Sequence, residues 1–142
     1  MRVMELAREG CDTLALSFDA SDTQLAHDCR RFFLGYLIEL GAPGEDFASA
    51  ELVLGELIGN VVRHTSGRVR MSVDWRGKYP ELAVSDSGDG FDLEAALPDD
   101  VLSEVGRGLF LVDALTHEFS VERLPGSGSV ARAVLRLERA LH

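Results

Sequence analysis

One segment of the chain carries polar residues at helical spacing. Glu56, Asn60 and His64 stand four residues apart, and Arg63 lies beside the last of them. On a helix these side chains share one face, because residues four apart stack along the axis. A carboxylate and a carboxamide on adjacent turns suit Mg²⁺, which takes hard oxygen ligands and shares phosphate oxygens with a protein. The Asn amide oxygen can bind the ion while the carboxylate orients a nucleophile.

The same stripe has a plainer interpretation as the solvated face of an amphipathic helix, and spacing alone favours it. A zinc site is not expected, because His64 has no second His or Cys at ligand spacing.

A second candidate follows a predicted strand. Leu82, Val84 and Asp86 share the parity of that strand, so Asp86 is expected to point toward the buried face. A carboxylate there needs a hydrogen-bond donor, and the amino group of adenine would supply one. Gly88 and Gly90 follow closely and let the backbone turn tightly against a ligand. An acidic turn after a strand is the alternative interpretation.

Two further glycine-containing segments lie nearer the C-terminus. Gly106-Arg107-Gly108-Leu109 opens a predicted helix, where free N–H groups and the Arg107 charge suit phosphate. A glycine-bearing loop before a helix is the alternative, because GxG alone is not specific and no Walker A motif is present. Gly126-Ser127-Gly128-Ser129 is typical of a hairpin turn.

A small α/β fold must position these segments. Alternating apolar residues predict one-sided strands, longer apolar periodicities predict helices, and Ser21 or Asp22 is placed to cap the first helix. The first half is predicted to hold a strand at 13–18, a helix that follows Ser21 or Asp22 and runs to about 40, a second helix at 45–64, and strands at 69–75 and 82–86. A long connection follows at 87–106, with a helical turn near 93–97. The chain then has a predicted helix at 108–115 and strands at about 119–121 and 130–137. A connection of that length in a compact domain is usually functional.

The order of these elements predicts the fold class. Because most strands alternate, one face of the sheet should be covered and the other more polar. A two-layer α/β sandwich, with a mixed but mostly antiparallel sheet and helices on one face, fits this pattern better than a doubly wound parallel sheet. With 142 residues, we expect a single domain over 1–142 and a core at about 10–138.

The composition excludes several functions. A formal net charge of −10 argues against nucleic acid as a partner. Lys78 is the only lysine, so a P-loop or Schiff-base mechanism has almost no candidate. The sequence has no apolar run of membrane length and no signal peptide at its start, which predicts a cytoplasmic protein without a membrane partner. Cys11 and Cys29 form no CxxC pair and are expected to be reduced thiols.

The order and spacing of the four segments together resemble a known family. Glu56-xxx-Asn60, Asp86-x-Gly88-x-Gly90, Gly106-x-Gly108 and Gly126-x-Gly128-Ser129 resemble the N, G1, G2 and G3 boxes of GHKL (Bergerat-fold) ATPases, over roughly residues 10–138. Within that superfamily, the small size and the segments ELIGNVVRH and GRGLFLV look like the stand-alone anti-sigma factor serine kinases of bacterial partner-switching systems.

The resemblance implies a role for each matched residue. Glu56 matches the general base toward a serine of a STAS-domain anti-anti-sigma protein, and Asn60 matches the Mg²⁺ ligand. Asp86 matches the carboxylate that recognises the adenine amino group. Gly88 and Gly90 would shape the adenine pocket. The other residues that we expect to bind the nucleotide are Arg63, Gly106, Arg107, Gly108, Leu109 and Ser129.

The sequence departs from the family pattern beside the phosphate segment. Some members carry a lid Arg just before the first glycine of the G2 box, where this chain has Glu104 and Val105. Arg107 is the candidate to replace it in catalysis, and weak phosphoryl transfer is the alternative. The stretch 91–105 is also acidic, which is unfavourable near a triphosphate unless the charges face outward.

The resemblance implies an ATP-binding regulatory serine/threonine-protein kinase that controls transcription as an anti-sigma factor. It would use ATP and Mg²⁺, bind a sigma factor, phosphorylate its STAS-domain antagonist and form a homodimer. The alternative is a nucleotide-dependent protein-binding switch without significant kinase activity.

Other classes fit less well. A histidine-kinase catalytic domain would need a helix pair with a phosphoacceptor His, and His27 lies on the first helix without such a pair before it. A chaperone or topoisomerase ATPase would need additional domains, and a fold that binds no nucleotide would make the four matches accidental.

Overall fold

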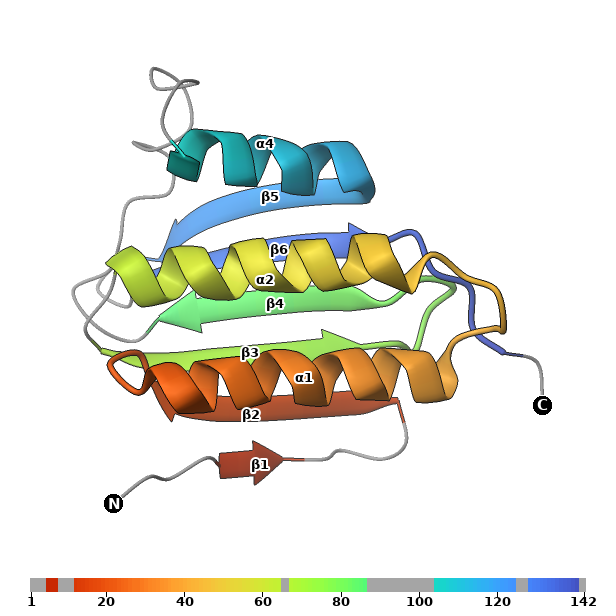
Figure 1. Cartoon of the computed structure of the whole chain (residues 1–142), viewed down its shortest axis with the longest axis horizontal. Coiled ribbons are helices and arrows are strands. Elements are labelled where there is room, and N and C mark those ends of the chain that lie inside the picture. Colours follow the sequence, from red (N-terminus) through yellow and green to blue (C-terminus); the bar gives the residue numbers. More distant parts are fainter. Residues whose placement is uncertain (1–4, 8–11, 65–66, 87–103, 125–127, 141–142) are drawn as a thin grey trace.

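The helices that the structure describes, α1, α2 and α4, lie on one face of an antiparallel sheet, as Figure 1 shows. The computed structural model describes residues 5–7, 12–64, 67–86, 104–124 and 128–140. Within them the sheet has six strands in the order β1-β2-β3-β4-β6-β5. The elements are β1 (Glu5–Ala7), β2 (Thr13–Asp19), α1 (Thr23–Leu40), α2 (Phe47–His64), β3 (Arg68–Asp74), β4 (Glu81–Asp86), α4 (Glu104–Leu115), β5 (Thr116–Leu124) and β6 (Gly128–Leu135).

The alternating strands produce the one-sided sheet that the sequence predicts. In β3, Val69, Met71 and Val73 are buried beneath the helices, whereas Arg70 is exposed and Ser72 is half-buried on the open face. Every pairing between the described strands is antiparallel, from β1–β2 to β5–β6. The predicted two-layer sandwich with helices on one face is therefore confirmed, and the described pairings show no parallel component.

The start and end of α1 have clear local causes. Asp22 is the N-cap, and its carboxylate accepts a hydrogen bond from the Leu25 N–H at 3.0 Å. Gly41 ends the helix with its N–H bonded to the Leu37 carbonyl at 2.8 Å. A Cβ at Gly41 would lie 2.7 Å from Cζ of Phe47, so only glycine allows the chain to turn so closely against α2.

The second helix buries the face that its sequence predicts. Leu54, Ile58 and Val61 are all buried against the sheet. The helix begins at Phe47 rather than at Glu45, because Asp46 accepts a hydrogen bond from the Ser49 N–H at 3.0 Å, as an N-cap residue does.

Other elements also differ from the sequence prediction, among them β5, which spans Thr116–Leu124 and is longer than the strand predicted at about 119–121. Strand β1 was not predicted, because three residues are too few to show an alternation. Helix α4 begins at Glu104, four residues before the predicted start, since its glycines lower helix propensity without preventing a helix. Strand β6 ends at Leu135, two residues before the predicted end. The predicted helical turn near 93–97 lies outside the described residues.

The hydrophobic core fills the space between the helices and the sheet. Its largest fully buried side chains include Trp75, Phe18 and Phe33. None of the helices in the described part of the chain combines the length and the apolar composition needed to cross a membrane.

Candidate functional site

One end of the sandwich brings together described residues from each of the four sequence segments. Figure 1 shows that the C-terminal ends of α2 and β4 and the beginnings of α4 and β6 lie at the same edge of the molecule. Glu56, midway along α2, meets Gly108 with its side chain, and Asp86 meets both Gly128 and Ser129. Contacts between α2 and β4 bring these two groups of residues together. Segments separated by more than forty residues in the chain therefore form one candidate site.

Asn60 is the most unusual residue of this site. Its side chain is 1% exposed, and within the described part of the chain neither Oδ1 nor Nδ2 has a hydrogen-bond partner. Leaving a buried polar group without a partner costs about 1–3 kcal/mol, so most buried carboxamides are hydrogen-bonded. A buried carboxamide without a partner is the state expected of a side chain whose partner is a ligand.

The protein oxygen that Asn60 offers fits a magnesium ion only if phosphate oxygens of the nucleotide also coordinate that ion. Among the described residues, no group of three His, Cys, Asp or Glu side chains could hold a metal ion together. Asn60 offers one hard oxygen, and Mg²⁺ commonly combines one or two protein oxygens with water and phosphate oxygens. The residues present therefore fit a nucleotide-bound Mg²⁺ and not a cage made of protein alone.

Glu56 lies one helical turn before Asn60, with its side chain half-buried between α2 and α4. Its carboxylate rests against Gly108, which is buried in the early part of α4. A Cβ at Gly108 would overlap Oε2 of Glu56 and would lie 3.0 Å from its Cδ. The absent side chain of Gly108 thus makes room for the Glu56 carboxylate beside the turn that we expect to bind phosphate.

Asp86 ends β4 on the covered face of the sheet, as its parity predicts. The side chain is 2% exposed, and its Oδ2 accepts a hydrogen bond from the Ser129 N–H at 3.2 Å. Antiparallel pairing of β4 with β6, with Ser85 opposite Val130, brings these residues together. The structure thus places two residues that we expect to bind the nucleotide, Asp86 and Ser129, in direct contact.

Gly128 belongs to the segment that resembles the G3 box, but it was not among the residues expected to bind the nucleotide. Its φ of +80° and its contact with Asp86 place it beside the candidate site. Its position directly before Ser129 was the signal that could have singled it out.

Other predicted site residues lie at the margin of this arrangement. Arg63 is exposed, and its Nη1 would lie 3.4 Å from a Cβ at Gly59, so its side chain runs back along the outer face of α2. Leu109 is fully buried in the core, which leaves only its backbone to meet a ligand. Gly106 belongs to the first turn of α4. Gly88 and Gly90 lie outside the described residues, as do the side chains of His64 and Arg107.

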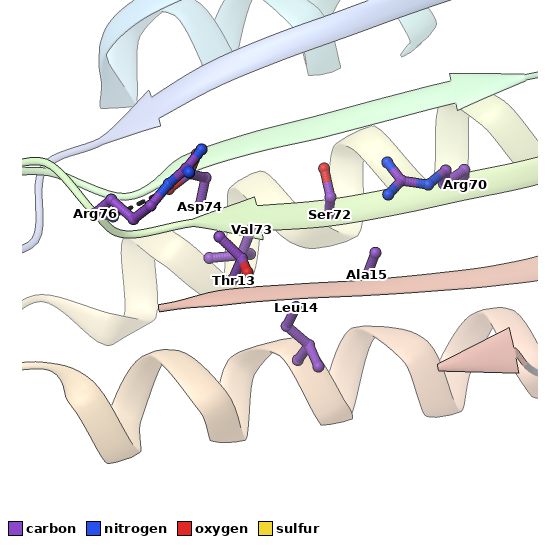
Figure 2. A pocket seen from close by; sticks show the side chains of 8 residues that line it. All are labelled: Thr13, Leu14, Ala15, Arg70, Ser72, Val73, Asp74 and Arg76. Atoms are coloured by element: carbon purple, nitrogen blue, oxygen red, sulfur yellow. Dashed lines mark hydrogen bonds and ion pairs between the residues drawn. The ribbon is translucent and has the colours of Figure 1, made fainter. Parts of the chain in front are cut away.

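Two cavities in the described structure lie away from this site. One, of about 160 Å³, opens on the bare face of β2 and β3, and Figure 2 shows its side chains with the ion pair between Arg76 and Asp74 at 2.7 Å. The other, of about 270 Å³, lies at the opposite end of α2 beside Ser49, Leu115 and Leu137. Neither is lined by a predicted site residue.

The shifted pKa values in the described structure belong to groups outside the site. Hydrogen bonds from Ser49 lower the pKa of Asp46, and the bond from Arg76 lowers that of Asp74. Burial raises the pKa of the Cys29 thiol to about 12. Cys29 is a free, buried cysteine, as predicted, whereas Cys11 lies outside the described residues.

Comparison with known proteins agrees with the geometry. The family model for the histidine kinase-like ATPase domain matches residues 18–135, which is most of the chain. The chain belongs to this family. The family match confirms the resemblance to GHKL ATPases, and ATP binding is the property that it supports.

Individual relatives point to one branch of the family. The chain is 28% identical to the serine-protein kinase RsbW of Staphylococcus aureus over 108 residues, which cover 65% of this chain and 68% of that protein. It is 26% identical to the serine-protein kinase RsbW of Staphylococcus epidermidis over the same length and the same shares of both chains.

Proposed function

We propose that this protein is an ATP-dependent serine-protein kinase that acts as an anti-sigma factor and phosphorylates a STAS-domain antagonist. The observation that carries the proposal is the buried Asn60, which has no hydrogen-bond partner among the described residues, one turn from a Glu56 carboxylate that lies against Gly108. The likeness to two proteins named serine-protein kinase supports the choice of serine as the acceptor.

In this proposal each end of the nucleotide has its own residues. Asp86 accepts a hydrogen bond from the adenine amino group, and the first turn of α4 receives the phosphates with its free N–H groups. Asn60 would hold Mg²⁺ through its amide oxygen. When bound, Mg²⁺ neutralises negative charge on the phosphate oxygens. Arg107 is the candidate for a side chain that stabilises the transferring phosphoryl group, in place of the missing lid Arg.

Glu56 acts on the acceptor serine. The serine Oγ attacks the γ-phosphorus and passes its proton to the Glu56 carboxylate. The bond between the γ-phosphorus and the oxygen of the departing ADP breaks, which leaves phosphoserine and ADP. Positioning and electrostatic stabilisation supply most of the catalysis in such reactions, so a half-buried carboxylate held beside α4 suits the task.

A second candidate is a nucleotide-dependent protein switch without significant transfer. The observation in its favour is that Glu104 and Val105, and not an Arg, precede Gly106 at the start of α4. Such a protein would bind its partner differently with ATP and with ADP and would leave the partner unmodified.

Incubation with labelled ATP and a STAS-domain partner separates the two candidates. We expect phosphoserine on the partner with the natural protein, and a loss of at least about a hundredfold in rate for Glu56→Ala while ATP affinity changes little. Tight ATP binding without phosphoserine would favour the switch. An equal loss of binding and transfer in Glu56→Ala would contradict the role of Glu56 as base.

The proposal extends to assembly and location. We expect a homodimer, which sedimentation at several protein concentrations would detect as a species of twice the mass of the 15.5 kDa chain. Because both ATP and a sigma factor are found in the cytoplasm, we place the protein there.

A further inference from the structure

The strand β6 approaches Asp86 unusually closely at Gly128. A Cβ at this position would overlap Oδ1 of Asp86, and it would lie 2.5 Å from the Asp86 carbonyl oxygen and 2.9 Å from its Cγ. Two of these atoms belong to the carboxyl group, and the third is a backbone atom that cannot rotate away. Only glycine therefore allows the two strands to meet at this point.

The backbone of Gly128 adds a second, separate requirement. Its φ of +80° lies in the left-handed region, where a residue with a Cβ is strained. Gly44, in the turn between α1 and α2, has a similar φ of +87°, but a Cβ there would meet nothing within 4 Å. Comparing the two glycines separates the backbone requirement, which they share, from contact with Asp86, which only Gly128 has.

The close approach fixes the orientation of the carboxyl group. It allows the Ser129 N–H, the next donor along β6, to reach Oδ2 of Asp86 at 3.2 Å. Because Asp86 is 2% exposed and Ser129 is 3% exposed, water cannot readily replace this bond. The carboxyl group is thus held between a main-chain donor and the Cα of Gly128, and its rotation about Cβ–Cγ is restricted.

We propose that Gly128 is a positioning residue that sets the base specificity of the nucleotide site. By letting the Ser129 N–H hold Asp86, it keeps the carboxylate opposite the 6-substituent of a purine. There the carboxylate accepts a hydrogen bond from the 6-amino group of adenine, and it repels the 6-oxo oxygen of hypoxanthine. A carboxylate released from this position could turn toward the N1–H of a 6-oxo purine and bind it instead. The inference rests on the proposed binding of ATP at this site.

The test compares the affinities for ADP and for IDP, whose base is hypoxanthine, by titration calorimetry with Mg²⁺. We expect Gly128→Ala to weaken ADP binding roughly tenfold to hundredfold and IDP binding much less, so that the preference for adenine falls. Gly44→Ala is the matched control. It imposes similar left-handed strain and should lower the melting temperature, but it should leave the ratio of the two affinities unchanged.

A second variant tests the orientation without altering the backbone. The Ser129 N–H requires an acceptor at the position of Oδ2, so in Asp86→Asn the amide oxygen should face Ser129 and the NH₂ group should face the base. That group would donate to the 6-oxo oxygen of hypoxanthine, and we expect Asp86→Asn to bind IDP more tightly than ADP. This variant keeps the inference testable if Gly128→Ala does not fold.

Specific results would overturn the inference. Equal weakening of ADP and IDP binding in Gly128→Ala would show that the glycine serves only the packing of the strands. Retained preference for ADP in Asp86→Asn would show that the Ser129 N–H does not orient this side chain. Either result would leave ATP binding and kinase activity standing, whereas failure of the natural protein to bind ADP would overturn the proposed function and this inference together.

Discussion

At the scale of a single residue, Asn60 lowers the stability of the folded protein. A buried carboxamide without a partner loses its hydrogen bonds to water and gains none in return. We therefore expect Asn60→Ala to raise the free energy of unfolding of the nucleotide-free protein by about 1 kcal/mol, measured by urea denaturation. Alanine also has the better helix propensity at this position in α2.

A neighbouring residue on α2 provides the control. Val61 is fully buried in the core, and Val61→Ala should lower the free energy of unfolding by at least about 1 kcal/mol, because it removes apolar contacts. If Asn60→Ala destabilised the protein as much as Val61→Ala, Asn60 would have a structural partner and its assignment to a ligand would be wrong.

Sequence reasoning proposed candidate site residues, but it could not show which of them are in contact. The spacing of Glu56 and Asn60 on one helix predicts that they are neighbours, and the parity of Asp86 predicts the face to which it points. The contact of Glu56 with Gly108 joins residues far apart in the sequence, and no local pattern encodes it. That Asn60 has no hydrogen-bond partner in the described part of the chain is likewise a property of its surroundings and not of its sequence position.

At the scale of the elements, the packing of α4 on α2 depends on the pair Glu56 and Gly108. In the natural protein, Gly108→Ala should lower the free energy of unfolding by at least about 1 kcal/mol, because the new Cβ overlaps the Glu56 carboxylate. In a Glu56→Ala background the overlap disappears. The same substitution should then stabilise α4 by about 0.5–1 kcal/mol through helix propensity.

Chemical denaturation of the four proteins of this double-mutant cycle measures the coupling. Gly35→Ala is a suitable control, because Gly35 lies within α1 and a Cβ there would meet nothing within 4 Å. It should stabilise the protein equally with and without Glu56. A Gly108→Ala effect that is also independent of Glu56 would refute the contact.

The beginning of α2 should respond to pH. Hydrogen bonds from Ser49 lower the pKa of Asp46 in the folded protein, so this cap stabilises the helix above the unfolded-state pKa and is lost as the pH falls through the folded-state pKa. The difference in melting temperature between the natural protein and Asp46→Ala should be present near neutral pH and should shrink below about pH 4. A difference that stayed constant down to about pH 2 would contradict the role of the charged cap.

Most elements could be predicted from the sequence because their patterns are local. The N-cap Asp22, the C-cap Gly41 that ends α1, and the alternation of buried residues in β3 are each determined by a few neighbouring residues. The early start of α4 could not be predicted, because its first turn contains Gly106, and glycine lowers helix propensity. Strand β1 is defined by its pairing with β2 and not by its own composition.

At the scale of the whole molecule, the candidate site lies at one end of the sandwich. The sheet and the helices enclose the core, and the described residues of the candidate site lie where α2 and the end of β4 meet the beginnings of α4 and β6 (Figure 1). The chain carries a net charge of −10, which repels a triphosphate. Mg²⁺ neutralises part of the triphosphate charge, so it should strengthen ATP binding more here than it would in a basic protein.

The Mg²⁺ dependence of ATP affinity tests the central claim that Asn60 completes an ATP site in this family member. Calorimetry would compare the natural protein with Asn60→Ala, each with Mg²⁺ and with EDTA. We predict that Mg²⁺ strengthens ATP binding to the natural protein by roughly tenfold or more, and that Asn60→Ala loses most of this gain while it still binds ATP weakly. An equal gain from Mg²⁺ in both proteins would contradict the account.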